Sequence, residues 1–436
     1  MSGFYKWLYS SITDATAKEI DSAENEVERL APMNFFHLLL ARTASKIGDR
    51  LASTKTTLAW LLQTLGAPAI FAGLIVTVRE SGSLLPQILL SNFIKRLGLR
   101  KWAWSIGALI QGIAIAMCAI IALTLKGVSA GIAILMAIVL FSLARGISSV
   151  SAKDVLGKTI PKSKRGQLTG WATSASGLVV IVTTSLFFFR SSSNSPVLLY
   201  AAYLGTAATL WFVAAIINAL VVEEKSEIKK GQHLMTGLKS QFELIRKEAH
   251  FRNFLIVRTL AVGSGLSSPY LITLAHEKLG GSSLWLGIFI IIEGLAATIS
   301  SPLWGKWADH SSRTVLCASM AALASLLLLV VIHAVTELFS EYSWLIFPLT
   351  FFFLGVAHAG VRVGRKTYIV NMAEGNRRTD YVSIANTLIG VLLLIAGLLA
   401  GIFSLIAVPI ALSFFAVAAL FGSLYGKQLK PLNKNS

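Results

Sequence analysis

Charged side chains stand within several stretches of this sequence that are otherwise apolar, and they are the groups whose chemistry needs an explanation. Seven are basic and three are acidic: Arg42, Lys46, Arg50, Lys55, Arg79, Arg145, Arg258, Asp49, Glu80 and Glu293. In hydrocarbon each such charge costs at least about 2.5–3.5 kcal/mol, so it needs a partner or a water-filled cavity. A carboxylate in such a place can carry a proton, and an arginine can hold a carboxylate or phosphate in bidentate fashion. The surplus of positive charge favours an anionic solute.

Four of these charges are predicted to share one face of a helix. At about 100° per residue, Arg42, Lys46, Asp49 and Arg50 fall within one third of the circumference, and Lys55 falls on the opposite side. A polar stripe on an apolar helix faces the interior of a helix bundle. We expect Asp49 to be ionised between its basic neighbours. The stripe could be an ion-pair network that fixes packing, a solute contact or, at Asp49, a proton-coupling site.

Two more carboxylates could carry protons. Glu80 follows Arg79, and it either forms a static pair with that arginine or takes a proton when the arginine is drawn elsewhere. Glu293 has no cation within one helical turn, so its partner comes from another helix, with Arg145 or Arg258 as the candidate, or it is protonated. Both arginines could instead lie at helix ends, where they reach the membrane surface.

The candidate site residues follow from these patterns. For proton coupling they are Glu293, Glu80 and Asp49. For solute binding they are Arg79, Arg145, Lys46, Arg50, Gln87 and Gln111. Gln87 shares the face of Glu80, and Gln111 either lines a cavity or bonds to a neighbouring helix.

The composition shows what must hold these charges in place. Of the 436 residues, 55% are hydrophobic and 14% are charged, with a mean hydropathy of +0.69. Soluble domains carry about 25% charged residues, so this chain has too little polar surface for a soluble globule. A bilayer core needs about 20 apolar residues per helix, and long apolar runs without strand alternation indicate helices. The net charge of +18 then reflects basic cytoplasmic loops rather than a nucleic-acid partner.

Twelve apolar segments are predicted to span the membrane. They are residues 34–62, 68–93, 103–125, 129–150, 167–190, 196–222, 253–275, 284–304, 314–336, 343–364, 381–404 and 407–426. An even number puts both termini on one side, where 29 of the 39 lysine and arginine residues lie, against three in the opposite loops. This bias predicts that both termini are cytoplasmic.

The predicted organisation is a tail (1–32), a six-helix bundle (33–222), a linker (223–252), a second six-helix bundle (253–426) and a tail (427–436). The linker carries Leu234, Leu238, Phe242 and Ile245 at helical spacing, which predicts an amphipathic helix on the membrane surface. The two halves also share a weak repeat, because an Asn-Phe pair precedes an Arg-Thr pair at the start of each.

The chain resembles the major facilitator superfamily over residues 34–426. The carrying features are the 6+6 arrangement, the long central linker and a loop signature of glycine, aspartate and a basic residue, which Gly305, Asp309 and Arg313 match. In the N-terminal copy Lys95 stands where the aspartate belongs, with Arg100 further on. Arg145-Gly146 partly resembles a motif of proton-coupled exporters but lacks the glutamine of that motif.

The resemblance implies an all-α membrane protein of two pseudo-symmetric bundles that rock about a central site. It assigns gating to Gly305, Asp309, Arg313, Lys95 and Arg100, and it implies a small-molecule substrate and a monomer. We expect proton-coupled efflux or exchange in a bacterial inner membrane. The alternatives are an uncoupled facilitator or lipid-like flippase, and a non-transporting scaffold or assembly factor. No phosphate-cradling loop, catalytic group or metal-ligand cluster occurs in the sequence, so we expect no enzyme, no cofactor and no metal.

Overall fold

The computed structural model describes residues 3–13, 26–85, 94, 96–161, 164–189, 196–225, 245–372 and 377–432. Every regular element within these ranges is helical. The N-terminal half holds α1 (Gly3–Ile12), α3 (Glu26–Leu51), α4 (Thr57–Thr64), α5 (Ala69–Leu84), α7 (Lys101–Thr124), α8 (Gly127–Thr159), α9 (Arg165–Phe188) and α10 (Pro196–Leu220). The C-terminal half holds α12 (Ala249–Leu260), α13 (Gly263–Leu266), α14 (Ser268–Leu279), α15 (Ser283–Thr336), the short 3₁₀ helix Ser340–Tyr342, α16 (Ser343–Met372), α17 (Arg377–Ile406) and α18 (Val408–Gly426).

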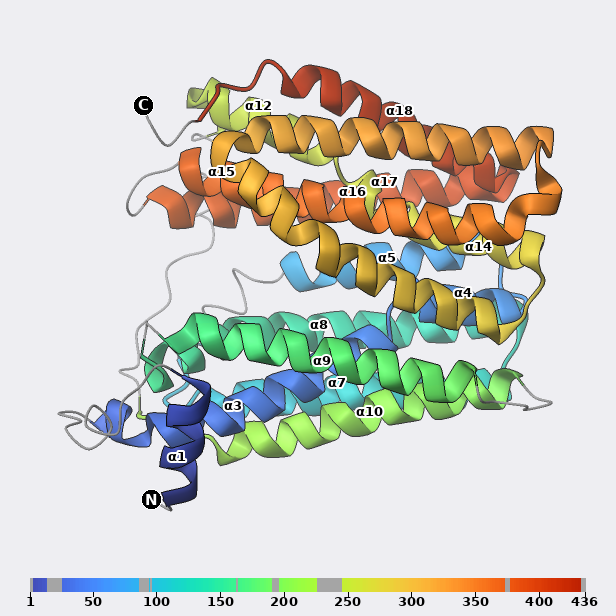
Figure 1. Cartoon of the computed structure of the whole chain (residues 1–436). Coiled ribbons are helices and arrows are strands. Elements are labelled where there is room, and N and C mark those ends of the chain that lie inside the picture. Colours follow the sequence, from blue (N-terminus) through green and yellow to red (C-terminus); the bar gives the residue numbers. More distant parts are fainter. Residues whose placement is uncertain are drawn as a thin grey trace.

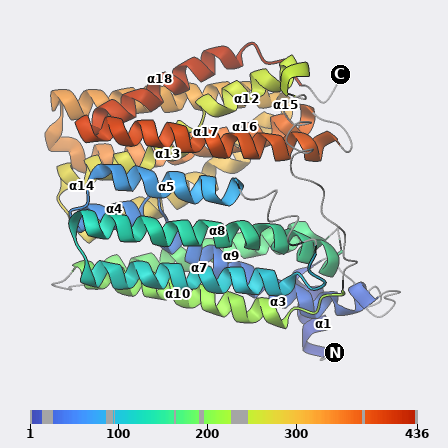
Figure 2. The same cartoon turned by 180° about the vertical axis from the view of Figure 1, so that it is seen from behind.

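The helices lie side by side in one elongated bundle, with both chain termini at the same end (Figure 1). We call this end the terminal end. The opposite end, with the turns at 65–68, 125–126 and 280–282, is the far end. Within the N-terminal half α7 packs against α8 and α10, and within the C-terminal half α15 packs against α16 and α18. The view from behind shows α5 between the two groups, where it contacts α17 (Figure 2).

The fold confirms the prediction of an all-α membrane protein with about twelve spans. Among the described residues, nine helices are long and apolar enough to cross a membrane. One of them, α15, runs for 54 residues and departs from helical geometry at Ser311, so it supplies two spans. The first two predicted spans fold as α3 with α4 and as α5. They are not among the nine apolar helices, because α3 carries several charges and α5 is only 16 residues long.

Several helices extend further than their predicted spans. Thus α8 ends at Thr159 instead of residue 150, and α16 ends at Met372 instead of residue 364. Hydropathy marks only the apolar part of a helix, while lysine and arginine are good helix formers that continue it beyond that part. The predicted amphipathic helix of the linker falls mostly on residues 226–244, which lie outside the described residues.

Small residues let the helices approach closely. A Cβ built on Gly355 of α16 would lie 2.8 Å from Cβ of Ala296 on α15. In a bilayer, helix association depends on such close packing because lipid is as apolar as the side chains. This packing holds α15 and α16, which carry the C-terminal part of the site.

Candidate functional site

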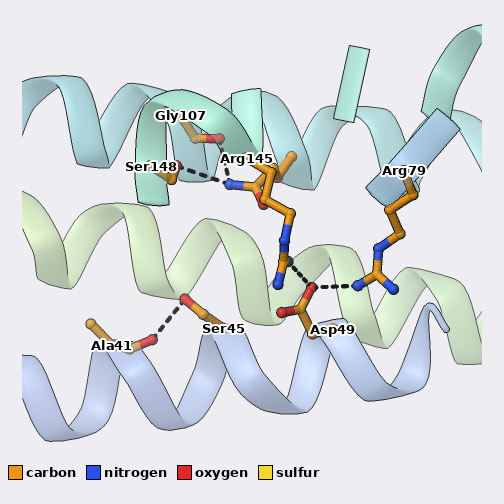
Figure 3. Close-up of polar contacts among 8 residues, drawn as sticks. Ala41, Ser45, Asp49, Arg79, Gly107, Arg145 and Ser148 are labelled. Carbon is orange, nitrogen blue, oxygen red and sulfur yellow. Dashed lines mark hydrogen bonds and ion pairs between the residues drawn. The ribbon is translucent and has the colours of Figure 1, made fainter. Parts of the chain in front are cut away.

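Asp49 is the centre of a three-helix ion-pair cluster (Figure 3). Its Oδ1 accepts a hydrogen bond from Nη2 of Arg79 at 2.9 Å and from Nη1 of Arg145 at 2.5 Å. The three residues come from α3, α5 and α8, so the cluster joins three helices of the N-terminal half. Arg79 also lies over the ring of Phe141 at 5.6 Å. The exposed fraction of the Asp49 side chain is 22% and that of Arg145 is 35%, so water-sized space adjoins the cluster.

This cluster gives Asp49 and Arg79 partners that the sequence did not assign. Asp49 bonds to arginines on other helices, whereas the sequence placed it between Lys46 and Arg50. Arg79 bonds to Asp49 and not to its neighbour Glu80. Adjacent residues on a helix point about 100° apart, so neighbours in sequence do not face each other, while a long arginine from a facing helix can reach the carboxylate.

A second polar group joins the two halves. Lys55 lies at the non-helical residues 52–56 between α3 and α4, and its Nζ is 3.5 Å from Nε2 of His358 on α16. Lysine has only donors, so Nε2 accepts, and Nδ1 of His358 then donates to Oγ of Ser264 at 3.3 Å. The backbone oxygen of Lys55 also accepts a bond from Oγ of Ser268 at 3.1 Å. A span of the N-terminal half is thereby bonded to two helices of the C-terminal half.

The position of Lys55 corrects another prediction. The helical count placed this side chain opposite the polar stripe. Because α3 ends at Leu51, the count of 100° per residue no longer applies at residue 55. The non-helical segment after Leu51 turns the lysine toward the C-terminal half.

The two remaining carboxylates flank Lys55. Glu80 lies on α5 and Glu293 on α15, and both interact electrostatically with Lys55. Each stands about 15 Å along its helix from the far end, which is half the thickness of a bilayer core. Within the described part of the chain, neither carboxylate has an ion pair within 4 Å. They form the acidic part of a mid-depth site to which both halves contribute.

Glu293 has other cations nearby than those predicted. Arg50 acts on it together with Lys55. The two arginines that were expected as its partners bond to other residues. Arg145 bonds to Asp49. Arg258 is buried and donates from Nη2 to Oδ1 of Asn386 at 2.9 Å.

The rest of the basic stripe on α3 faces other helices. Nζ of Lys46 donates to Oγ1 of Thr173 on α9 at 2.9 Å. Arg42 lies over Trp104 at 5.9 Å and donates to the backbone oxygen of Ala152 at 3.3 Å. Lys46 and the exposed Arg50 follow Arg42 along α3, so they lie closer to the mid-depth site than Arg42 does.

The two predicted glutamines have different outcomes. Gln111 is fully buried, and its Nε2 donates to the backbone oxygen of Gly107 and to Oγ of Ser148, both at 3.0 Å. It therefore joins α7 to α8, one of the two roles predicted for it. Gln87 lies outside the described residues.

The predicted gating residues that the structure describes have separate surroundings. Nη1 of Arg313 donates to the backbone oxygens of Lys427 at 3.3 Å and Leu429 at 3.0 Å, at the end of α18. Asp309 is exposed and Gly305 has open space around it. Lys95 lies outside the described residues.

Arg100 belongs to an ionic cluster at the terminal end that the sequence reading missed. It pairs with Asp154, which also pairs with Lys158 at 3.2 Å. Lys158 reaches Glu223 at 3.0 Å, and Glu223 accepts the backbone N–H of Lys101 at 2.7 Å. The cluster joins α7 and α8 to the chain that follows α10. Its acids and bases are far apart in sequence, so the only signal for it was the density of basic residues in these loops.

Comparison with known proteins places the fold. The sequence model described as "Major Facilitator Superfamily" matches residues 254–434. Among curated proteins, none matches the chain. A D-xylose-proton symporter structure has a TM-score of 0.67 at 12% identity, covering 93% of this chain and 99% of that one. The inward-open xylose transporter XylE from E. coli gives 0.66 at 11%, covering 92% and 97%.

A third similar structure is a bacterial homologue of the iron transporter ferroportin in its inward-facing state. Its TM-score is 0.65 at 15% identity, covering 91% of this chain and 98% of that one. At these identities the likeness shows the fold over nearly the whole chain.

Proposed function

We propose that the chain is a secondary active transporter that moves a small solute by alternating access, in exchange for protons, since residues 254–434 match the major facilitator superfamily model and the whole fold resembles that of the solved transporters named above. The observation that carries this proposal is the mid-depth site between the halves. Lys55 and Glu80 come from the N-terminal half, and His358 and Glu293 come from the C-terminal half. A site built from both halves changes its exposure when they rock, whereas a site inside one half does not.

In this mechanism Glu293 and Glu80 are the proton carriers. Both stand within reach of the charge on Lys55, so protonation of either carboxyl alters the balance that holds Lys55 near His358. That contact crosses between the halves and has to break when the far end opens. Asp49 is held by two arginines within one half, which supports a positioning role for it rather than proton transfer.

The test begins with purified protein and a thermal-shift screen of metabolites, since a specific ligand stabilises the folded state by mass action. The ligand is then followed in proteoliposomes with an imposed pH gradient. We expect Glu293→Gln and Glu80→Gln to lose pH-driven accumulation while downhill flux persists. Glu341→Gln, at an exposed residue of the 3₁₀ helix, is the control.

The outcomes separate the competing functions. Undiminished pH-driven transport in both variants removes these carboxylates from the mechanism. Solute flux in wild type that ignores the pH gradient indicates an uncoupled facilitator or flippase. No solute movement under any gradient indicates a scaffold.

We also propose that the chain is a monomer in a bacterial inner membrane with its terminal end in the cytoplasm. The excess of lysine and arginine in the loops of that end supports this orientation. A cysteine placed at Glu341 should react with an impermeant thiol reagent on intact cells, and one at Lys430 should not. The reverse pattern would invert the topology.

A further inference from the structure

Like charges face each other across the two halves. On α3, Lys46 and Arg50 both interact electrostatically with Arg362, which lies on α16 of the other half. Arg50 and Arg362 are both exposed although each interacts with the opposite half, so space is left beside their guanidinium groups.

The same arrangement continues toward the terminal end. Lys153 on α8 and Lys366 on α16 are both exposed and act on each other electrostatically. Positive charges from opposite halves therefore face each other at successive levels between the terminal end and the mid-depth site.

Acids do not balance this lining within the described residues. The carboxylate of Asp49 is bonded to Arg79 and Arg145, so we do not count it among the acids that balance the lining. Around the mid-depth site, five cations then share two carboxylates, Glu80 and Glu293. The five are Lys46, Arg50, Lys55, Arg362 and Arg365. Three positive charges remain unbalanced.

Unbalanced cations on opposite halves affect how the halves can move. Closing the terminal end brings Arg362 nearer to Arg50 and Lys46, and their repulsion grows as the separation falls. An anion between them turns that repulsion into attraction, and arginine forks suit carboxylate and phosphate oxygens.

We propose that the transported solute is an oxyanion with at least two negative charges, held between Arg50 and Lys46 of one half and Arg362 of the other. This rests on the transport function proposed above and deepens it. Because the empty site repels its own two halves, the unloaded protein closes slowly. Exchange of one anion for another is therefore faster than net movement.

The binding test uses purified full-length protein and pairs of ligands that differ mainly in charge. Succinate is compared with its diamide, and glycerol 3-phosphate with glycerol, by thermal shift. We expect one or both dianions to stabilise the protein and the neutral partners not to. Dicarboxylate and phosphate ester are the two sources of this chemistry, and the pairs distinguish them. Stabilisation only by the neutral partners, or no stabilisation by either dianion, overturns the proposal.

Variants test the residues. Arg50→Gln and Arg362→Gln should each weaken dianion binding about tenfold or more, the loss expected for one charge-assisted hydrogen bond. Arg362→Lys keeps the charge, so it should recover part of the binding, which a folding defect would not allow. Lys278→Gln, in a surface ion pair at the far end, is the matched control and should bind as wild type does. Equal binding by all variants overturns the proposal.

Exchange is measured in proteoliposomes with radiolabelled dianion outside. Uptake into vesicles preloaded with the unlabelled dianion should exceed uptake into empty vesicles about tenfold or more, and Arg362→Gln should reduce this ratio, because one of the repelling charges is gone. A ratio near one in wild type overturns this proposal but leaves the proposed transport function intact. Absence of any solute flux, with neutral and cationic solutes included, refutes the transport function itself.

Discussion

Replacing Asp49 by asparagine should destabilise the N-terminal half by about 3 kcal/mol. The variant removes the charge that accepts two guanidinium bonds, at 2.9 Å from Arg79 and 2.5 Å from Arg145, and leaves the two cations facing each other. Removing one partner of a buried ion pair costs about 3–5 kcal/mol. The lower end applies here, because the Arg145 side chain is 35% exposed and water screens part of its charge.

The assay is thermal unfolding of the purified protein in detergent. Unfolding entropy is about 2.1 cal/mol/K per residue, so 3 kcal/mol spread over the 436 residues lowers Tm by about 3 °C. If the N-terminal half unfolds as its own unit, the shift is larger. Glu341→Gln, at an exposed carboxylate, controls for loss of charge alone and should leave Tm unchanged.

A double-mutant cycle decides whether the ion pair is the cause. With Asp49→Asn already present, Arg145→Gln should cost at least about 1 kcal/mol less than it does in wild type, since the bond is already lost. Strictly additive effects, or an Asp49→Asn variant as stable as wild type, would refute the reasoning.

Two further predictions concern carboxylates outside the central site. Glu223→Gln should lower Tm more than the adjacent exposed Glu224→Gln does, because the Glu223 side chain is fully buried against Lys158, and equal shifts would contradict this. At the far end, the hydrogen bond and charge of Lys278 hold the pKa of Glu337 below its usual value of 4.5. This carboxyl therefore adds a small stability above about pH 4.5 that is lost as the pH falls through its lowered pKa. Glu337→Gln should fall slightly below wild type in Tm at pH 7, and this difference should shrink as the pH falls below 4.5; a difference that grows in acid would contradict the assignment.

The sequence was sufficient for the architecture because the governing signal is local. Each apolar segment reports its own burial in lipid, and twelve of them in two sets of six leave few arrangements. The weakest prediction was the extent of helices such as α8 and α16, since hydropathy cannot see a helix continuing through basic residues.

The candidate site was only partly predictable, for a different reason. The sequence singled out Asp49, Glu80 and Glu293, yet it could not give their partners, which come from other helices. Lys55 was misplaced because the break after Leu51 has no strong sequence mark. His358 could not be predicted as the partner of Lys55, since a single histidine on an apolar helix carries no spacing signal.

The polar contacts divide into two kinds that suit a rocking mechanism. The central ion pairs lie within the N-terminal half and are short, with Asp49 at 2.9 Å from Arg79 and 2.5 Å from Arg145. The contacts described above that cross between the halves at mid-depth are hydrogen bonds without an ion pair, at 3.5 Å from Lys55 to His358 and 3.1 Å from Ser268 to Lys55. Strong bonds inside a half keep it rigid as it moves, and weak ones between halves can break and reform with each cycle. An ion pair as short as that of Asp49, placed across the halves instead, would hold the protein in one state. The cluster at Asp49 therefore fits a frame that moves as a unit, with the chemistry of transport left to the carboxylates beside Lys55.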